Sequence, residues 1–153
     1  MTSDDSQTAE AAIRRLADEL FLTTDAKDWA AARALFADGP IDVDMTSLVG
    51  GTPVRITADE LFAGFRTGLH AGKVSHHMAT NYRVTISGGR AELTAHGYAW
   101  NRVPAFPPGQ DLWETWGVYR LTCRRTAAGW YLDGFQYQSK HTRGNDAVRT
   151  HTG

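Results

Sequence analysis

The segment Arg83-Val84-Thr85-Ile86-Ser87-Gly88-Gly89-Arg90-Ala91-Glu92-Leu93 decides the fold class of this chain of 153 residues. Apolar and polar residues alternate on both sides of a Ser-Gly-Gly turn, and the alternation continues from Ala91 through Val103. Two such runs joined by a glycine-rich turn are typical of a β-hairpin. Leu112 through Cys123 and Trp130 through Gln138 repeat the pattern around a turn at Ala127-Ala128-Gly129. The second half of the chain therefore predicts long antiparallel strands.

The first part of the chain predicts helices instead. A short helix is expected from Asp28 to the stop at Asp38-Gly39-Pro40, followed by a short alternating strand, Ile41 to Met45. Thr57-Ala58-Asp59-Glu60 has the spacing of a capping box and predicts the start of a further helix. The first helix, which we expect to begin near Thr8, is indicated by residues at helical spacing: Ile13, Leu16, Ala17, Leu20 and Thr24.

Helices at one end of the chain and long strands at the other favour an α+β fold. Because such long strands bend, we expect a curved antiparallel sheet wrapped around the N-terminal helices as a cone with an interior pocket. A chain of this length forms one domain. We place the domain at residues 9–140, between a disordered N-terminus at 1–8 and a polar, frayed tail at 141–153.

Charge and composition argue against several classes of function. Lys and Arg number 16 and Asp and Glu 17, so the net charge of −1 offers no basic surface for nucleic acid. No apolar run is long enough to cross a bilayer, and the acidic segment Met1 to Asp5 is unlike a signal peptide, so no membrane association is expected. The single Cys123 fits a structural role in a reducing, cytoplasmic location. No pair of the six histidines has the spacing of a zinc site, and we expect no metal and no organic cofactor.

Two short strings carry the candidate chemistry. Thr24-Asp25-Ala26-Lys27-Asp28-Trp29 places a carboxylate at the end of the first helix, and His76-His77-Met78-Ala79-Thr80-Asn81 places imidazoles at the start of a strand. A carboxylate that orients a histidine can move a proton without a cofactor. In the alternative interpretation, Asp25 simply caps the next helix. Counting back in twos from Val84 and Ile86 puts His76, and not His77, on the core face.

The order of elements and these strings resemble the SnoaL-like branch of the NTF2-like superfamily, nearest to the scytalone dehydratases and the lindane dehydrochlorinases. The resemblance covers residues 9 to 140. The segment Asp25–Trp29 is similar to the one that carries the dehydratases' catalytic aspartate. The segment His77–Val84 is similar to the one that carries the dehydrochlorinases' catalytic histidine, and Trp130–Phe135 resembles the family's last strand. The resemblance implies that Asp25 and His77 form the acid–base dyad. It therefore favours His77 over His76, which requires a bulge or kink in the strand.

The chain also departs from these relatives. Thr24 and Met45 match the positions of two tyrosines with which the dehydratases hold a water on the substrate carbonyl, and their second histidine matches a small residue such as Gly97 or Ala99. The resemblance thus implies the dyad and the pocket without the scytalone substrate. Beside Asp25 and His77, we expect these residues to line the pocket: Thr24, Met45, Phe65, His76, Gly97, Ala99, Tyr119 and Phe135.

Other residues suggest less specific roles. Asp42 and Asp44 share a strand face and form either an acid–base pair or, as we favour, solvated or rim positions. His70 is expected at a helix C-terminus, and His141 and His151 in the tail. Aromatic residues on an exposed sheet face predict a homo-oligomer, either a dimer or a trimer: Tyr98, Trp100, Trp113 and Trp116.

The sequence supports two hypotheses of different class. The first is a cofactor-independent lyase, of dehydratase or dehydrohalogenase type, or an isomerase, in which Asp25 and His77 act on a small, mostly apolar cyclic substrate. The second is a non-catalytic small-molecule-binding or assembly module of the same fold, which needs the pocket but not a buried Asp–His pair.

Overall fold

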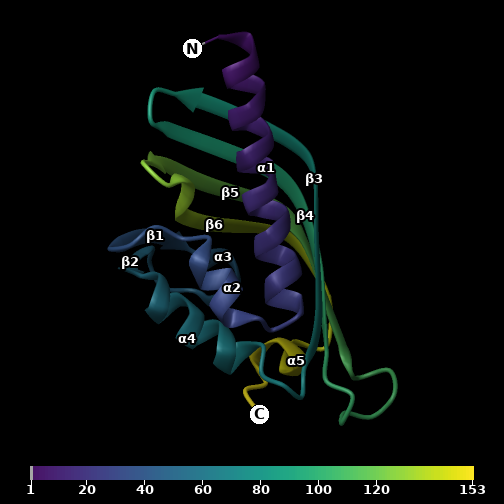
Figure 1. Cartoon of the computed structure of the whole chain (residues 1–153). Helices are drawn as coiled ribbons and strands as arrows, with labels where there is room; N and C mark the ends of the chain where they lie inside the picture. Colours follow the sequence, from purple (N-terminus) through teal and green to yellow (C-terminus); the bar gives the residue numbers. More distant parts are fainter. Residues whose placement is uncertain (1) are drawn as a thin grey trace.

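A bent six-stranded sheet forms one side of the molecule, and helices lie along its inner side (Figure 1). The structure is a computed structural model, and it describes residues 2–153. The strands are β1 (Pro40–Asp44), β2 (Val54–Thr57), β3 (Val74–Ser87), β4 (Arg90–Arg102), β5 (Leu112–Thr126) and β6 (Gly129–Gly144). The helices are α1 (Ser3–Asp25), α2 (Trp29–Ala34), α3 (Thr46–Val49), α4 (Ala58–Gly68) and α5 (Asp146–Thr150).

The strand order is β2-β1-β6-β5-β4-β3. Neighbouring strands are antiparallel except for β1 and β6, which pair in parallel through Asp42 and Gly134, Val43 and Phe135, and Asp44 and Gln136. The predicted α+β fold with a curved sheet around N-terminal helices is confirmed, but the sheet is mixed and not purely antiparallel. The parallel pair arises because β1 and β2 form their own edge hairpin, which joins the meander β3 to β6 from the side.

Capping residues set the starts of the two longer helices. Thr57 and Glu60 form the predicted capping box of α4, with the Glu60 carboxylate accepting a hydrogen bond from the Thr57 N–H at 2.7 Å. A second capping box, between Thr2 and Asp5, starts α1 at Ser3, earlier than the predicted start near Thr8. The first turns of α1 are polar and exposed, so hydrophobic periodicity does not reveal them.

The C-terminal segment is ordered, whereas the sequence led us to expect a frayed tail. Strand β6 continues to Gly144, and the Asn145 side chain caps α5 by accepting a hydrogen bond from the Ala147 N–H at 3.1 Å. Val148 is fully buried beside Val103 and Trp113. A single apolar side chain therefore anchors the end of the chain, and the polar composition around it hides this role.

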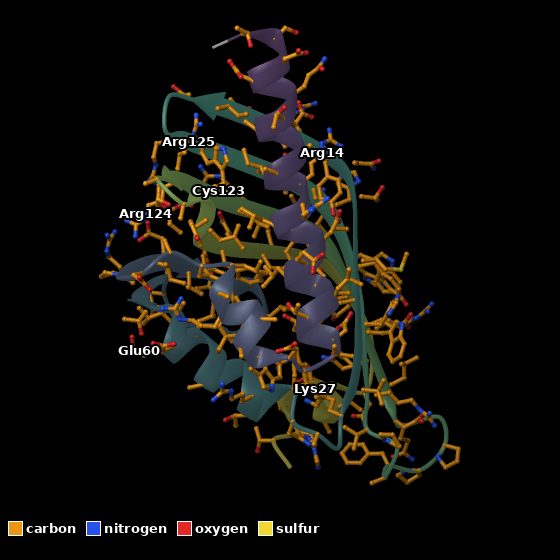
Figure 2. All side chains as sticks on the ribbon, viewed as in Figure 1. Arg14, Lys27, Glu60, Cys123, Arg124 and Arg125 are labelled. Atoms are coloured by element: carbon orange, nitrogen blue, oxygen red, sulfur yellow. The ribbon has the colours of Figure 1, made fainter. Side chains whose placement is uncertain are left out.

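The main core lies between α1, α4 and the inner face of the sheet. Ile13, Leu20 and Phe21 of α1 pack in one buried cluster with Leu93 and Leu121 of the sheet. Cys123 belongs to the same cluster, and Figure 2 labels it on the sheet beside α1. Within residues 2–153, no helix is both long and apolar enough to cross a membrane. This packing holds the end of α1 against the first half of β3.

Candidate active site

Asp25 is the last residue of α1, and its carboxylate is not used to cap the next helix. Lys27, labelled in Figure 2 at the turn after α1, has a φ of 57° and reverses the chain. Asp28 then caps α2, accepting a hydrogen bond from the Ala31 N–H at 3.1 Å. The capping interpretation of Asp25 is therefore wrong, because Asp28 fills that role.

The Asp25 carboxylate accepts three hydrogen bonds, all from β3. The Ser75 hydroxyl donates to Oδ1 at 2.9 Å, and the main-chain N–H of His77 donates to Oδ2 at 2.7 Å. The Nδ1 atom of the His77 ring lies 2.6 Å from Oδ1. Both side chains are only 18% exposed. The expected contact between Asp25 and His77 is present, and Ser75, which the sequence analysis did not single out, completes it.

These bonds determine which nitrogen of His77 is available for chemistry. An ionised carboxylate can only accept hydrogen bonds, so Nδ1 must carry the proton. The neutral ring then has its lone pair on Nε2. The ring lines the cavity described below, and its face lies nearly parallel to Phe21 with centroids 6.0 Å apart. The arrangement presents a part-buried, oriented imidazole to the cavity.

The charge state of Asp25 follows from opposing effects. Burial alone would raise its pKa, but hydrogen bonds from the His77 ring, the His77 N–H and Ser75, together with the charge of the His77 ring, hold the pKa below its ordinary value. Asp25 therefore stays ionised at neutral pH and can balance a positive charge on His77.

A β-bulge places His77, and not His76, on the inner face. Thr80 pairs with His96 and Arg83 pairs with Thr94, so two residues of β3 lie opposite one residue of β4. Asn81, inside the bulge, has a φ of 57°. Counting in twos fails across this bulge, and His76 points to the outer face, where it stacks on Trp100 with centroids 5.6 Å apart. The prediction that His76 lines the pocket is therefore wrong.

A cavity of about 400 Å³ opens beside His77. Its walls are mainly apolar and come from α1, α3, α4 and the inner face of the sheet. Of the residues predicted to line the pocket, it contains these: Thr24, Met45, Phe65, Ala99, Tyr119 and Phe135. Gly97 does not line it, because the Tyr119 ring covers that position and a β-carbon on Gly97 would lie 2.2 Å from Tyr119 Cε2. Gly97 gives room for Tyr119 instead of contacting a substrate.

Several residues of the cavity wall were not predicted from the sequence. Asn101 and Thr115 belong to the inner faces of β4 and β5, and alternation from Ala99 and Tyr119 was a signal that could have found them. Tyr137 follows Phe135 by two residues on β6 in the same way. Leu48 of α3 and Arg149 of α5 also line the cavity, but their short helices carry no periodic signal.

Trp113 corrects our assignment of the outer aromatic face. It is 4% exposed and lines the cavity, whereas Trp116 on the same strand lies on the outer face beside Tyr98, with ring centroids 5.1 Å apart. Residues three apart on a regular strand face opposite sides, so the two tryptophans cannot share one face. The outer face keeps Tyr98, Trp100 and Trp116.

The remaining candidates have structural roles. Asp42 pairs with Arg55 at 3.2 Å, and Asp44 accepts a hydrogen bond from the Thr46 N–H at 3.0 Å just before α3. His70 follows α4, and its Nε2 lies 2.9 Å from Nδ1 of His151, so His151 is held in place. His141 lies on β6 against Trp116, with ring centroids 5.4 Å apart.

The described residues, 2–153, hold neither a group of metal ligands nor a reactive thiol. Among residues 2–153, no three His, Cys, Asp or Glu side chains are grouped to hold a metal ion. Cys123 is fully buried, and burial raises the pKa of its thiol to about 12, so it stays a neutral part of the core. The cavity wall instead contains the imidazole of His77, whose Nδ1 lies against Asp25.

Comparisons with known proteins agree with this architecture. Residues 5–136 match the family model of the SnoaL-like domain. No curated protein matches the sequence significantly. The predicted resemblance to the SnoaL-like family is confirmed.

Solved structures share the fold over nearly the whole chain. The protein Kfla4162 of Kribbella flavida is 27% identical, with a TM-score of 0.84, and the match covers 90% of this chain and 95% of that one. A protein of Novosphingobium aromaticivorans, provisionally described as a scytalone dehydratase, is 16% identical, with a TM-score of 0.76 and coverage of 93% and 91%. The hexachlorocyclohexane dehydrochlorinase LinA-type3 of Novosphingobium barchaimii is 12% identical, with a TM-score of 0.76 and coverage of 93% of both chains.

Proposed function

The chain belongs to the SnoaL-like domain family, and from that premise we propose that it is a cofactor-independent lyase, of dehydratase or dehydrohalogenase type, or an isomerase. Its substrate is a small, mostly apolar cyclic compound. The observation that carries the proposal is the part-buried contact of 2.6 Å between Asp25 Oδ1 and His77 Nδ1 at the wall of the cavity. A binding module of this fold has no need of a part-buried Asp–His contact of this kind.

His77 is the base of the proposed reaction. The lone pair of Nε2 takes a proton from a substrate carbon, and the electrons of the broken C–H bond form a carbon–carbon double bond. In a dehydration, the imidazolium returns the proton to the departing hydroxyl, which leaves as water. In a dehydrohalogenation the halide leaves, and in an isomerisation the imidazolium returns the proton to another carbon. Such general acid–base catalysis contributes about 10²–10⁴-fold.

Asp25 acts on His77 and not on the substrate. The ionised carboxylate holds the proton on Nδ1 and balances the positive charge that forms on the ring. The apolar walls exclude water and strengthen this attraction. A cavity of about 400 Å³ is within the range of small-molecule sites and holds one or two fused rings.

The test follows proton exchange at carbon by NMR in D₂O, using a panel of cyclic ketones, alcohols and halides, because exchange requires no knowledge of the leaving group. We expect exchange or elimination with the wild type, without added metal or nucleotide and in the presence of a chelator. His77→Ala should abolish it.

His76→Ala is the matched control, because the two histidines are neighbours on opposite faces of β3. It should leave the rate largely unchanged. Loss of the reaction in His76→Ala but not in His77→Ala would overturn the assignment. Tight binding of ring compounds with no exchange in the wild type would instead favour a non-catalytic binding module.

A further inference from the structure

A pair of histidines, His70 and His151, joins the end of α4 to the end of α5, which lie side by side in Figure 1. Nε2 of His70 lies 2.9 Å from Nδ1 of His151, and the ring centroids are 5.0 Å apart. His70 directly follows Leu69, and His151 lies two residues after Arg149; both of these neighbours line the cavity. The histidine pair therefore connects two parts of the cavity wall that are far apart in the sequence.

The main chain determines which ring nitrogens carry protons. The N–H of Gly72 donates a hydrogen bond to Nδ1 of His70 at 3.1 Å. Because a main-chain N–H can only donate, this Nδ1 has no proton, and the His70 ring carries its proton on Nε2. That Nε2–H group then donates to Nδ1 of His151, whose own proton must lie on Nε2. Both rings are therefore neutral in this arrangement.

A further proton on either ring removes a hydrogen bond. A neutral imidazole gains a proton only on the nitrogen that lacks one. On His70 that nitrogen faces the Gly72 N–H, so a proton there costs this bond. On His151 it faces the Nε2–H of His70, so a proton there places two donors, and two positive rings, against each other. The contact between the rings cannot hold two protonated histidines.

The charges around the histidine pair also oppose protonation. Lys27 lies in the turn after α1, and Lys73 lies just before β3. Burial lowers the pKa of His70, and the charges of His151, Lys73 and Lys27 lower it further. A second positive ring at this position would thus be added to a group of like charges.

Few other contacts hold α5 in place. Val148 is the buried residue of this five-residue helix, and Nζ of Lys73 donates to the Arg149 carbonyl at 3.1 Å. Phe106, in the loop between β4 and β5, meets His151 edge-on with centroids 5.2 Å apart. Asp146 binds Arg149 at 2.7 Å, and this hydrogen bond lowers the pKa of Asp146. The carboxylate thus stays ionised and paired with Arg149, so it does not balance a charge on the histidines.

We propose that the histidine pair is a pH-sensitive closure of the cavity, which holds α5 in place while both rings are neutral and releases residues 145–151 when both gain a proton. Release removes Arg149 from the cavity wall and opens the end of the cavity next to Leu69. The main core contains neither histidine, so the rest of the fold stays closed. Small molecules then enter the cavity faster at mildly acidic pH than at neutral pH. This closure is independent of the proposed function, because entry precedes any reaction.

Two measurements on the full chain, at about pH 7 and about pH 5, test the closure. Amide hydrogen exchange, followed by NMR and corrected for the direct effect of pH on exchange, reports on the Val148 amide, which donates to the Asn145 carbonyl at 3.0 Å. Stopped-flow fluorescence with the uncharged probe N-phenyl-1-naphthylamine reports on entry to the cavity. At the lower pH we expect protection of this amide to fall about tenfold, the worth of one or two net hydrogen bonds. The probe should enter severalfold faster, while the amides of β4 and β5 keep their protection.

Two variants remove the titrating pair. The double substitution His70→Gln with His151→Asn replaces the rings with amides, which can still donate and accept but do not gain a proton in this pH range. It should show the same protection and the same probe entry at both pH values. His151→Ala removes the contact and should also lose the pH response, whether or not the amide pair holds α5. His77 is present in every variant, so its own protonation cannot produce a difference between them.

His141→Asn is the matched control, because it replaces a histidine on the outer face, against Trp116, with the same amide. It should respond to pH as the wild type does. A wild type with equal protection at both pH values would overturn the inference, and so would a full pH response in either variant of the histidine pair. Loss of protection in β4 and β5 together with α5 would show general unfolding and would overturn it as well.

Discussion

Asp25→Asn exchanges one carboxylate oxygen for an NH₂ group and keeps the shape of the side chain, so its effect reports on the hydrogen bonds of Asp25. In the wild type, the carboxylate accepts from Ser75 at 2.9 Å, from the His77 N–H at 2.7 Å and from the His77 ring at 2.6 Å. An amide accepts at one end only and donates at the other. At least one of the partners must therefore lose its bond or change its role.

Two arrangements are available to the amide. With its oxygen at the position of Oδ1, the NH₂ group faces the His77 N–H, and a buried donor without a partner costs about 1–3 kcal/mol. With the amide reversed, its oxygen accepts from the His77 N–H, and its NH₂ group faces His77 Nδ1 and the Ser75 hydroxyl. Both of these can accept, provided that the ring moves its proton to Nε2.

We expect the reversed arrangement, because it leaves no buried donor unpaired. The free energy of unfolding should fall by about 1–2 kcal/mol, since three charge-assisted bonds become neutral ones. The effect on chemistry should be much larger. Nε2 then carries a proton and cannot accept another, and no carboxylate balances the imidazolium, so proton exchange should fall by about 10²–10⁴-fold.

Three measurements on the same variant separate these effects. Urea unfolding gives the stability, proton exchange at carbon in D₂O gives the activity, and ¹⁵N NMR of labelled histidine shows which ring nitrogen carries the proton. Ser75→Ala serves as the control, because it removes one bond from Asp25 Oδ1 and leaves the carboxylate bound to His77. It should retain the Nδ1–H tautomer and most of the exchange.

Wild-type exchange in Asp25→Asn would refute the role of the carboxylate. Loss of exchange with the proton still on Nδ1 would refute the tautomer argument and leave only charge balance.

Three further predictions concern the rest of the molecule. Lys73 is 1% exposed, and burial lowers its pKa from 10.5 to about 8. Between pH 8 and 10.5 the folded state therefore binds fewer protons than the unfolded state, so the free energy of unfolding should rise by up to about 3 kcal/mol relative to Lys73→Met. Parallel pH curves for the two proteins in urea unfolding would contradict this. Asn81→Val should lower the free energy of unfolding by about 1–2 kcal/mol and Asn81→Gly by less, because a β-branched residue at a φ of 57° is strained. Equal losses of the free energy of unfolding in the two variants would show that the backbone conformation is not the cause. The outer rings of Tyr98, Trp100 and Trp116 should be buried in a homodimer or homotrimer detectable by light scattering, which Trp116→Glu disrupts; a wild-type monomer at micromolar concentration would refute this.

Local patterns predicted most of the elements. Alternation around Ser87-Gly88-Gly89 identified the β3–β4 hairpin, and the Thr57–Glu60 capping box identified the start of α4, because these signals lie within a few residues of the structure they specify. The order of the sheet is different. The parallel pairing of β1 with β6 joins segments about ninety residues apart, such as Asp42 and Gly134, and nothing local records it.

The candidate site shows the same limit at the level of single side chains. Asp25 and His77 were recognisable from their strings, but the face on which His77 lies depends on a bulge four to five residues further along β3, at Asn81 and Tyr82. Counting residues in twos assumes a regular strand. The count is correct at Val84, beyond the bulge, but before the bulge it wrongly assigns the inner face to His76. The bulge links fold and function, because it bends β3 around α1 and sets the half of the strand that carries Ser75 and His77 facing Asp25. A residue whose role is to shift register carries no chemical signature of its own. Asn81 in the bulge and Ser75 beside Asp25 both belong to this arrangement, although neither would be selected from the sequence as a candidate for catalysis.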